Sequence, residues 1–141
     1  MPSVSLPDPD QQAIERLIIE ASYRIDHGLA DSLFELFTAD ASLTFGDLEL
    51  HGREAIAEWG RNRVKRGGVS RHIISNSRFS DATSDRVHAV SLVTAFISNV
   101  DPPAPALPSV VGEYHDTFVR DQKDWLFASR TLSVLFVGSP H

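Results

Sequence analysis

Two residues in different parts of the chain could together form a general acid–base pair. Asp26 lies near the end of a segment with helical periodicity, and His72 lies in a segment of alternating pattern. A carboxylate can orient an imidazole ring and stabilise its charged form, while the ring moves a proton at near-neutral pH. Each residue taken singly has an ordinary interpretation, as a helix-end aspartate in solvent and as a strand histidine. As a pair they predict proton transfer, provided that the fold brings them together.

The sequence lacks the motifs of several other enzyme classes. It has no cysteine, so it has no thiol nucleophile, disulfide or thiolate metal site. It has no GxSxG nucleophile motif, phosphate-binding loop or Rossmann glycine fingerprint. Its six histidines do not show the i, i+4 spacing of a zinc-hydrolase motif. We therefore expect neither a metal nor a cofactor.

Composition and charge are those of a globular domain of 141 residues, with 42% hydrophobic and 23% charged residues. A net charge of −6 repels phosphate backbones, so we expect no nucleic-acid partner. The one basic cluster is interpreted as the solvated end of a helix and comprises Arg61, Arg63, Lys65 and Arg66. We expect no membrane span, because no apolar run is long enough. The first residues do not resemble a signal peptide, so we expect a cytoplasmic location.

The element that must position Asp26 is an N-terminal helix. Residues 1–9 contain three prolines and predict a flexible arm, while residues 10–141 are expected to form a single domain. Asp10 is expected to cap a helix that ends near His27, before Gly28. Ile19, Tyr23 and Asp26 form its second stripe. Its main apolar stripe consists of Ile14, Leu17, Ile18, Ala21 and Ile25.

The element that must position His72 is one of several strands. A short helix capped by Asp31, a hairpin around residues 46–47 and a helix over 53–66 are expected first. Strands are then expected near 69–79, 86–100, 110–121 and 125–137, with a proline-stiffened loop over 101–109. The order indicates an α+β fold in which three N-terminal helices pack on a curved, mostly antiparallel sheet.

The order and spacing of four segments resemble the SnoaL-like family of the nuclear transport factor 2-like superfamily. These segments are YRIDHGLADSLFELFTADASL (23–43), HGREAI (51–56), RHIISN (71–76) and GEYHDTFVRDQKDWLFASR (112–130). The resemblance covers roughly residues 10–137. It implies a cone-shaped roll that encloses a pocket. Scytalone dehydratases, a lindane dehydrochlorinase and bile-acid dehydratases share this plan.

The resemblance implies roles for six residues. Asp26 and His72 match the family's proton-transfer pair. The implied substrate-binding residues are Tyr23, Asn76, Tyr114 and Arg130. Each of these four also has a structural interpretation: core packing for the tyrosines, a structural hydrogen bond for Asn76 and an ion pair for Arg130. The sequence departs from the scytalone dehydratases at Ile97, which stands nearest to the place of their second histidine.

The function that follows is a cofactor-independent lyase or isomerase, dehydratase-like, acting on a hydrophobic cyclic or polyketide-like molecule. The alternative is a non-catalytic ligand-binding or assembly subunit of the same fold, such as the small subunit of ring-hydroxylating dioxygenases. The expected pocket walls are Phe34, Leu43, Phe45, Trp59, Val93 and Phe118. Relatives commonly assemble through the outer sheet face, so we expect a homodimer or homotrimer, with Ile73, Ser75 and Phe79 on that face.

Overall fold

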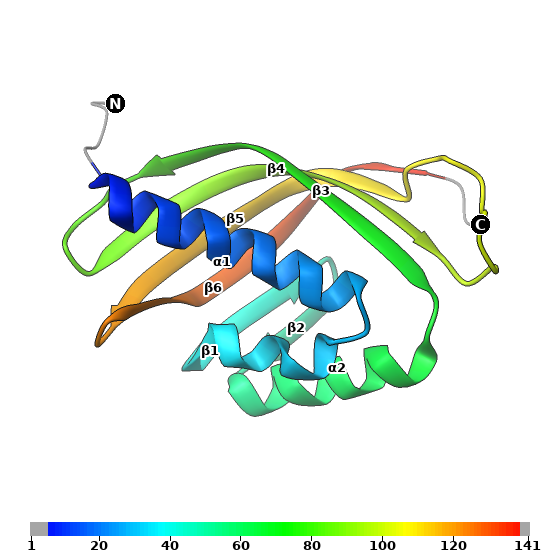
Figure 1. The fold of residues 1–141 in the computed structure, drawn as a ribbon, viewed down its shortest axis with the longest axis horizontal. Coiled ribbons are helices and arrows are strands. Elements are labelled where there is room, and N and C mark those ends of the chain that lie inside the picture. Colours follow the sequence, from blue (N-terminus) through cyan, green and yellow to red (C-terminus); the bar gives the residue numbers. More distant parts are fainter. Residues whose placement is uncertain (1–5, 139–141) are drawn as a thin grey trace.

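One curved sheet and the helices that cover its concave face make up the molecule (Figure 1). The computed structural model describes residues 6–138. The helical elements are α1 (Asp8–Asp26), the 3₁₀ helix η1 (Ala30–Leu36) and α2 (Arg53–Arg66). The strands are β1 (Phe37–Phe45), β2 (Leu48–His51), β3 (Val69–Ser80), β4 (Arg86–Ser98), β5 (Val110–Asp121) and β6 (Asp124–Val137).

The sheet has the strand order β2-β1-β6-β5-β4-β3 and is not closed. α2 carries the chain from the β1–β2 hairpin to β3 at the opposite edge. The antiparallel strands β3 to β6 then return across the sheet, so β6 meets β1 in parallel. This arrangement confirms the predicted α+β class with a mostly antiparallel sheet.

The start of α1 differs from the expectation. The helix begins at Asp8, with Pro7 at its N-cap position, and Leu6 is buried in the core. Asp10 lies inside the helix, and its carboxylate accepts a hydrogen bond from Trp125 Nε1 at 3.2 Å and pairs with Arg120 at 2.9 Å. The expected cap at Asp10 is therefore wrong, because these distant partners bind its carboxylate. Residues 1–5 of the expected arm lie outside the described residues.

The other elements lie close to their predicted positions. The helix at 53–66, the hairpin and the four long strands are present. The second of the three helices is a 3₁₀ helix, and Asp31 lies within its first turn instead of capping it. Within residues 6–138, no helix combines the length and apolar character needed to cross a membrane.

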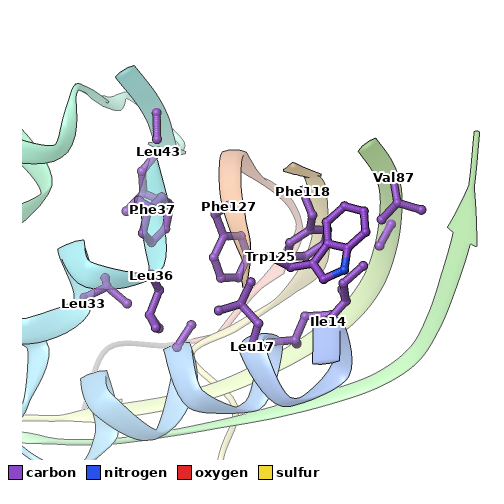
Figure 2. Packing of buried hydrophobic residues seen from close by; sticks show 14 of the residues in the cluster. Ile14, Leu17, Leu33, Leu36, Phe37, Leu43, Val87, Phe118, Trp125 and Phe127 are labelled. Atoms are coloured by element: carbon purple, nitrogen blue, oxygen red, sulfur yellow. The ribbon is translucent and has the colours of Figure 1, made fainter. Parts of the chain in front are cut away.

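The hydrophobic core fills one end of the space between α1 and the sheet (Figure 2). Ile14 and Leu17 of α1 lie close to Trp125 and Phe127 of β6 in this view. The Phe127 ring stacks on Phe37 with centroids 4.8 Å apart. Because these side chains fill that end, a ligand cavity has space only farther along the concave face.

Candidate active site

Asp26 and His72 are in direct contact. Asp26 is the last residue of α1, and β3 passes beside it. His72 Nδ1 lies 2.7 Å from Asp26 Oδ1, and the His72 backbone N–H donates to Oδ2 at 2.9 Å. The Ser70 hydroxyl donates to Oδ1 at 2.8 Å. Three donors from one strand therefore fix the carboxylate against the imidazole ring.

This contact determines which ring nitrogen can act as a base. An ionised carboxylate only accepts hydrogen bonds, so the Nδ1 of His72 must carry the shared hydrogen. In the neutral ring, Nε2 is then the unprotonated nitrogen. The ring also lines a cavity between the helices and the sheet. The arrangement can therefore take a proton at Nε2 while Asp26 stabilises the resulting imidazolium.

Asp26 is held in its ionised form. Burial raises the pKa of its carboxyl group, but the hydrogen bonds from His72 and Ser70 and the charge of His72 outweigh burial. The net result is a pKa below the ordinary value of 3.8. Both side chains are shielded from solvent, with 5% of Asp26 and 12% of His72 exposed. The pair is therefore partly desolvated, which strengthens its interaction.

A cavity of about 260 Å³ extends from the ring of His72 along the concave face. This volume is just below the roughly 300–1,000 Å³ typical of small-molecule sites, so a compact ring system would fill it. Its wall is largely apolar, with polar groups at few points. The lining residues are Ile25, Phe45, Trp59, Arg63, Arg66, Ser70, His72, Val93, Ala95, Ile97, Val110, Tyr114 and Leu132.

Three of the six expected wall residues line this cavity: Phe45, Trp59 and Val93. The other three do not. Leu43 and Phe118 are buried in the hydrophobic core, and Phe34 packs against it. Strand alternation gives the correct face for Leu43 and Phe118, but the core occupies that end of the sheet.

Tyr114 and Arg130 form a buried cluster next to the cavity. The Tyr114 ring lines the cavity, and the Arg130 guanidinium lies 3.7 Å from the ring centroid. Burial raises the pKa of the Tyr114 hydroxyl, so it remains a hydrogen-bond donor. Arg130 donates to both oxygens of Asp116, at 2.8 and 3.0 Å. Burial alone would lower the pKa of Arg130, but the charge of Asp116 outweighs it. Arg130 thus packs against the Tyr114 ring and does not line this cavity.

The structure places Tyr23 outside the cavity. Half of its surface is exposed, and its ring stacks on His27 with centroids 4.1 Å apart. Residues three apart on a helix differ by roughly 60° around its axis, so Asp26 can turn toward β3 while Tyr23 points to solvent. The sequence pattern did not reveal how far α1 is rotated when it docks on the sheet.

Asn76 also lies outside the cavity. It is exposed, with a φ of 55°, at the point where the pairing of β3 with β4 shifts between Ser75 and Arg78. A bulge breaks the alternation of side chains, so Asn76 does not share the face of His72. The same bulge turns Phe79 from the outer face toward the core.

Ser70, Arg63 and Asp116 contribute to the site but were not predicted. Ser70 precedes His72 by two positions, and Asp116 follows Tyr114 by two, so strand alternation places each pair on one face. That signal could have identified both residues. Arg63 carries no such signal, because its role depends on where α2 docks. Among residues 6–138, no group of three His, Asp or Glu side chains could hold a metal ion.

The comparisons with known proteins agree with this fold. A family model described as a SnoaL-like domain matches residues 9–131. A candidate scytalone dehydratase from Novosphingobium aromaticivorans has a TM-score of 0.82 at 23% identity, covering 94% of this chain and 89% of that chain. Type 2 of the hexachlorocyclohexane dehydrochlorinase LinA has a TM-score of 0.77 at 16% identity, covering 92% of this chain and 88% of that chain.

A third solved structure has a different kind of function. The β subunit of a candidate aromatic-ring-hydroxylating dioxygenase from N. aromaticivorans has a TM-score of 0.80 at 17% identity, with coverages of 91% and 90%. No curated protein matches the sequence. At such identities the structural matches establish the fold alone.

Proposed function

Because the chain belongs to the SnoaL-like domain family, we propose that it is a cofactor-independent lyase or isomerase, dehydratase-like, that acts on a hydrophobic cyclic or polyketide-like molecule. The observation that carries the proposal is the 2.7 Å contact between Asp26 and His72 Nδ1 beside an apolar cavity. General acid–base chemistry needs a base that is oriented in this way and lies within hydrogen-bond reach of the bound substrate.

The chemistry begins with proton removal. His72 Nε2 takes a proton from a carbon or oxygen of the bound molecule, and ionised Asp26 stabilises the imidazolium. The Tyr114 hydroxyl donates to the oxygen on which negative charge develops. Departure of a leaving group, or return of the proton to another atom, completes an elimination or isomerisation. Positioned proton transfer contributes about 10²–10⁴-fold, and one donor to the developing oxyanion roughly 3 kcal/mol.

A second function deserves the same test, because the β subunit of a candidate dioxygenase has the same fold. Under this alternative the chain binds a ligand or assembles with another subunit and catalyses nothing. The two functions differ in one respect: only the enzyme moves a proton to or from its ligand through His72.

The decisive experiment measures hydrogen exchange into a panel of cyclic ketones, hydroxylated aromatics and polyketide-like ketones. Incubation in D₂O followed by mass spectrometry detects proton abstraction from carbon whatever the direction of the overall reaction. We expect enzyme-dependent deuterium uptake or product formation with at least one compound. Asp26→Asn and His72→Gln should each lower that rate at least about a hundredfold.

His88→Gln is the matched control. His88 lies on β4, bonds Thr117 and does not line the cavity, so its loss should leave the rate unchanged. If exchange occurs and survives both Asp26→Asn and His72→Gln, the proposed mechanism is wrong. If panel members bind but none exchanges or reacts, the binding function is favoured.

The cytoplasmic location stays a prediction, which cell fractionation would test.

A further inference from the structure

The cavity has a charged rim on one side. Arg63 and Arg66, from the last turn of α2, line it together with a wall that is otherwise mostly apolar. No aspartate or glutamate is among the lining residues that the structure describes. The carboxylate of the site, Asp26, is almost fully buried and is bonded to His72 and Ser70. A bound molecule would therefore meet two cations and no exposed carboxylate.

Within residues 6–138, neither of these cations forms an ion pair with an acidic side chain. The Arg63 guanidinium donates to the Gly67 carbonyl at 2.7 Å and to the Ser70 hydroxyl at 3.2 Å, and both acceptors are uncharged. No ion pair of residues 6–138 includes Arg66, which is exposed. Of the other arginines in residues 6–138, Arg24, Arg61, Arg120 and Arg130 each pair with an acid, whereas Arg16, Arg53, Arg71, Arg78 and Arg86 do not.

The helix dipole accounts for only part of this arrangement. Cations at the end of a helix are favoured whatever lies nearby, and Lys65 satisfies the same preference. Lys65, however, does not line the cavity. The two arginines that do line it are presented to the ligand space on a protein whose net charge is −6. The helix dipole alone therefore does not explain why these two arginines line the cavity, whereas an anionic group on the ligand would.

We propose that the natural ligand is an amphipathic anion: a compact apolar ring system with one oxyanion group, a carboxylate or sulfonate, that binds Arg66 and Arg63. This inference rests on the proposed function, since it names the class of that function's substrate. The ring system lies against Trp59, Phe45 and Val93, and the oxyanion stays at the rim. Arginine suits this role, because its guanidinium offers paired donors to such a group.

The test compares charged probes with neutral probes of the same shape. Isothermal calorimetry gives the affinity of the full chain for naphthalene-2-carboxylate and naphthalene-2-carboxamide, and for the corresponding sulfonate and sulfonamide. We expect the anion to bind about five- to tenfold more tightly than its neutral partner in at least one pair. The preference should weaken as salt is raised, because the rim is open to solvent.

Variants test whether the two arginines cause the preference for the anion over its neutral partner. Arg66→Gln should reduce this preference to about twofold or less, and the double variant with Arg63→Gln should abolish it. Lys65→Gln removes the same charge from the same turn without touching the cavity, so it should leave the preference intact. Asp26→Asn should also retain it.

Three results would overturn the inference: equal affinity for anion and amide in both pairs, a preference that survives the double variant, or the same loss with Lys65→Gln. Failure of the proposed function looks different. In that case the anion preference remains, but no panel compound exchanges hydrogen or reacts.

Discussion

The hydrogen bonds that converge on Asp26 decide what this residue contributes at each pH. Three donors from β3 stabilise its ionised form and hold its pKa below 3.8. In the unfolded chain that carboxyl group has no such donors, so its pKa is ordinary. A carboxyl group whose pKa is lower in the folded state stabilises the fold at pH values above its unfolded-state pKa. This stabilisation is lost as the pH falls through the folded-state pKa.

We therefore expect a pH-dependent gap in the free energy of unfolding between the wild type and Asp26→Asn. Asp26→Asn should be less stable than the wild type near pH 7, because the amide loses the charge-assisted bonds. As the pH falls below 3.8 toward the lowered folded-state pKa, the gap should narrow, since the wild type also loses its carboxylate. Urea denaturation at a series of pH values measures it. A gap that stays constant over this range would show that Asp26 is not stabilised as an anion.

At the scale of the elements, strands β5 and β6 carry a buried ion pair between the core and the cavity. Asp116 and Arg130 face each other in the strand register, and both are almost fully buried. Removing one charge of a buried pair leaves the other without compensation. Arg130 in turn lies against the Tyr114 ring. The pair therefore supports both the sheet and the wall of the cavity.

Asp116→Asn should destabilise the protein by about 3 kcal/mol or more, because the buried Arg130 keeps its charge. Glu113→Gln is the matched control: Glu113 lies on the same strand, is partly exposed and, among residues 6–138, pairs only with His115. That change should alter stability by less than about 1 kcal/mol. Thermal and urea unfolding of the two variants give the comparison. Equal losses of stability in the two variants would contradict the prediction that removing one charge of the buried pair is costly.

The elements themselves could be predicted largely from local patterns. Gly52 and Gly67 bound the helix over 53–66, and alternating residues define the long strands. Features set by distant contacts could not be. The partners of Asp10 are Trp125 and Arg120, and the orientation of Asn76 depends on a bulge between β3 and β4. Of the site, Asp26 and His72 could be predicted, whereas the rotation of α1 that exposes Tyr23 could not.

At the scale of the whole molecule, the outer face of the sheet has exposed apolar side chains. The strand register places Ile73, Thr94, Val111 and Phe136 in one row across β3, β4, β5 and β6. Thr94 lies between Val93 and Ala95, which line the cavity, so this row is on the opposite face. Ile73 is 55% and Phe136 67% exposed. Apolar surface of this kind favours association.

We propose that this face joins copies of the chain into a dimer or trimer. Light scattering at micromolar concentration should give the mass of an assembly, and Ile73→Glu should reduce it to the mass of a monomer. Ile19→Glu serves as the control, because Ile19 is 65% exposed on α1, away from this row. A monomeric wild type would contradict the proposal. So would an assembly that withstands Ile73→Glu but not Ile19→Glu.

The most direct measurement of the central claim is the protonation pattern of the His72 ring. ¹⁵N NMR of the labelled protein, at a pH where the ring is neutral, distinguishes Nδ1–H from Nε2–H. The geometry predicts hydrogen on Nδ1, bonded to Asp26, and an unprotonated Nε2 in the wild type. Asp26→Asn should remove this preference. A wild-type ring with hydrogen on Nε2 and a bare Nδ1 would contradict the account, because Nε2 could not then accept a proton.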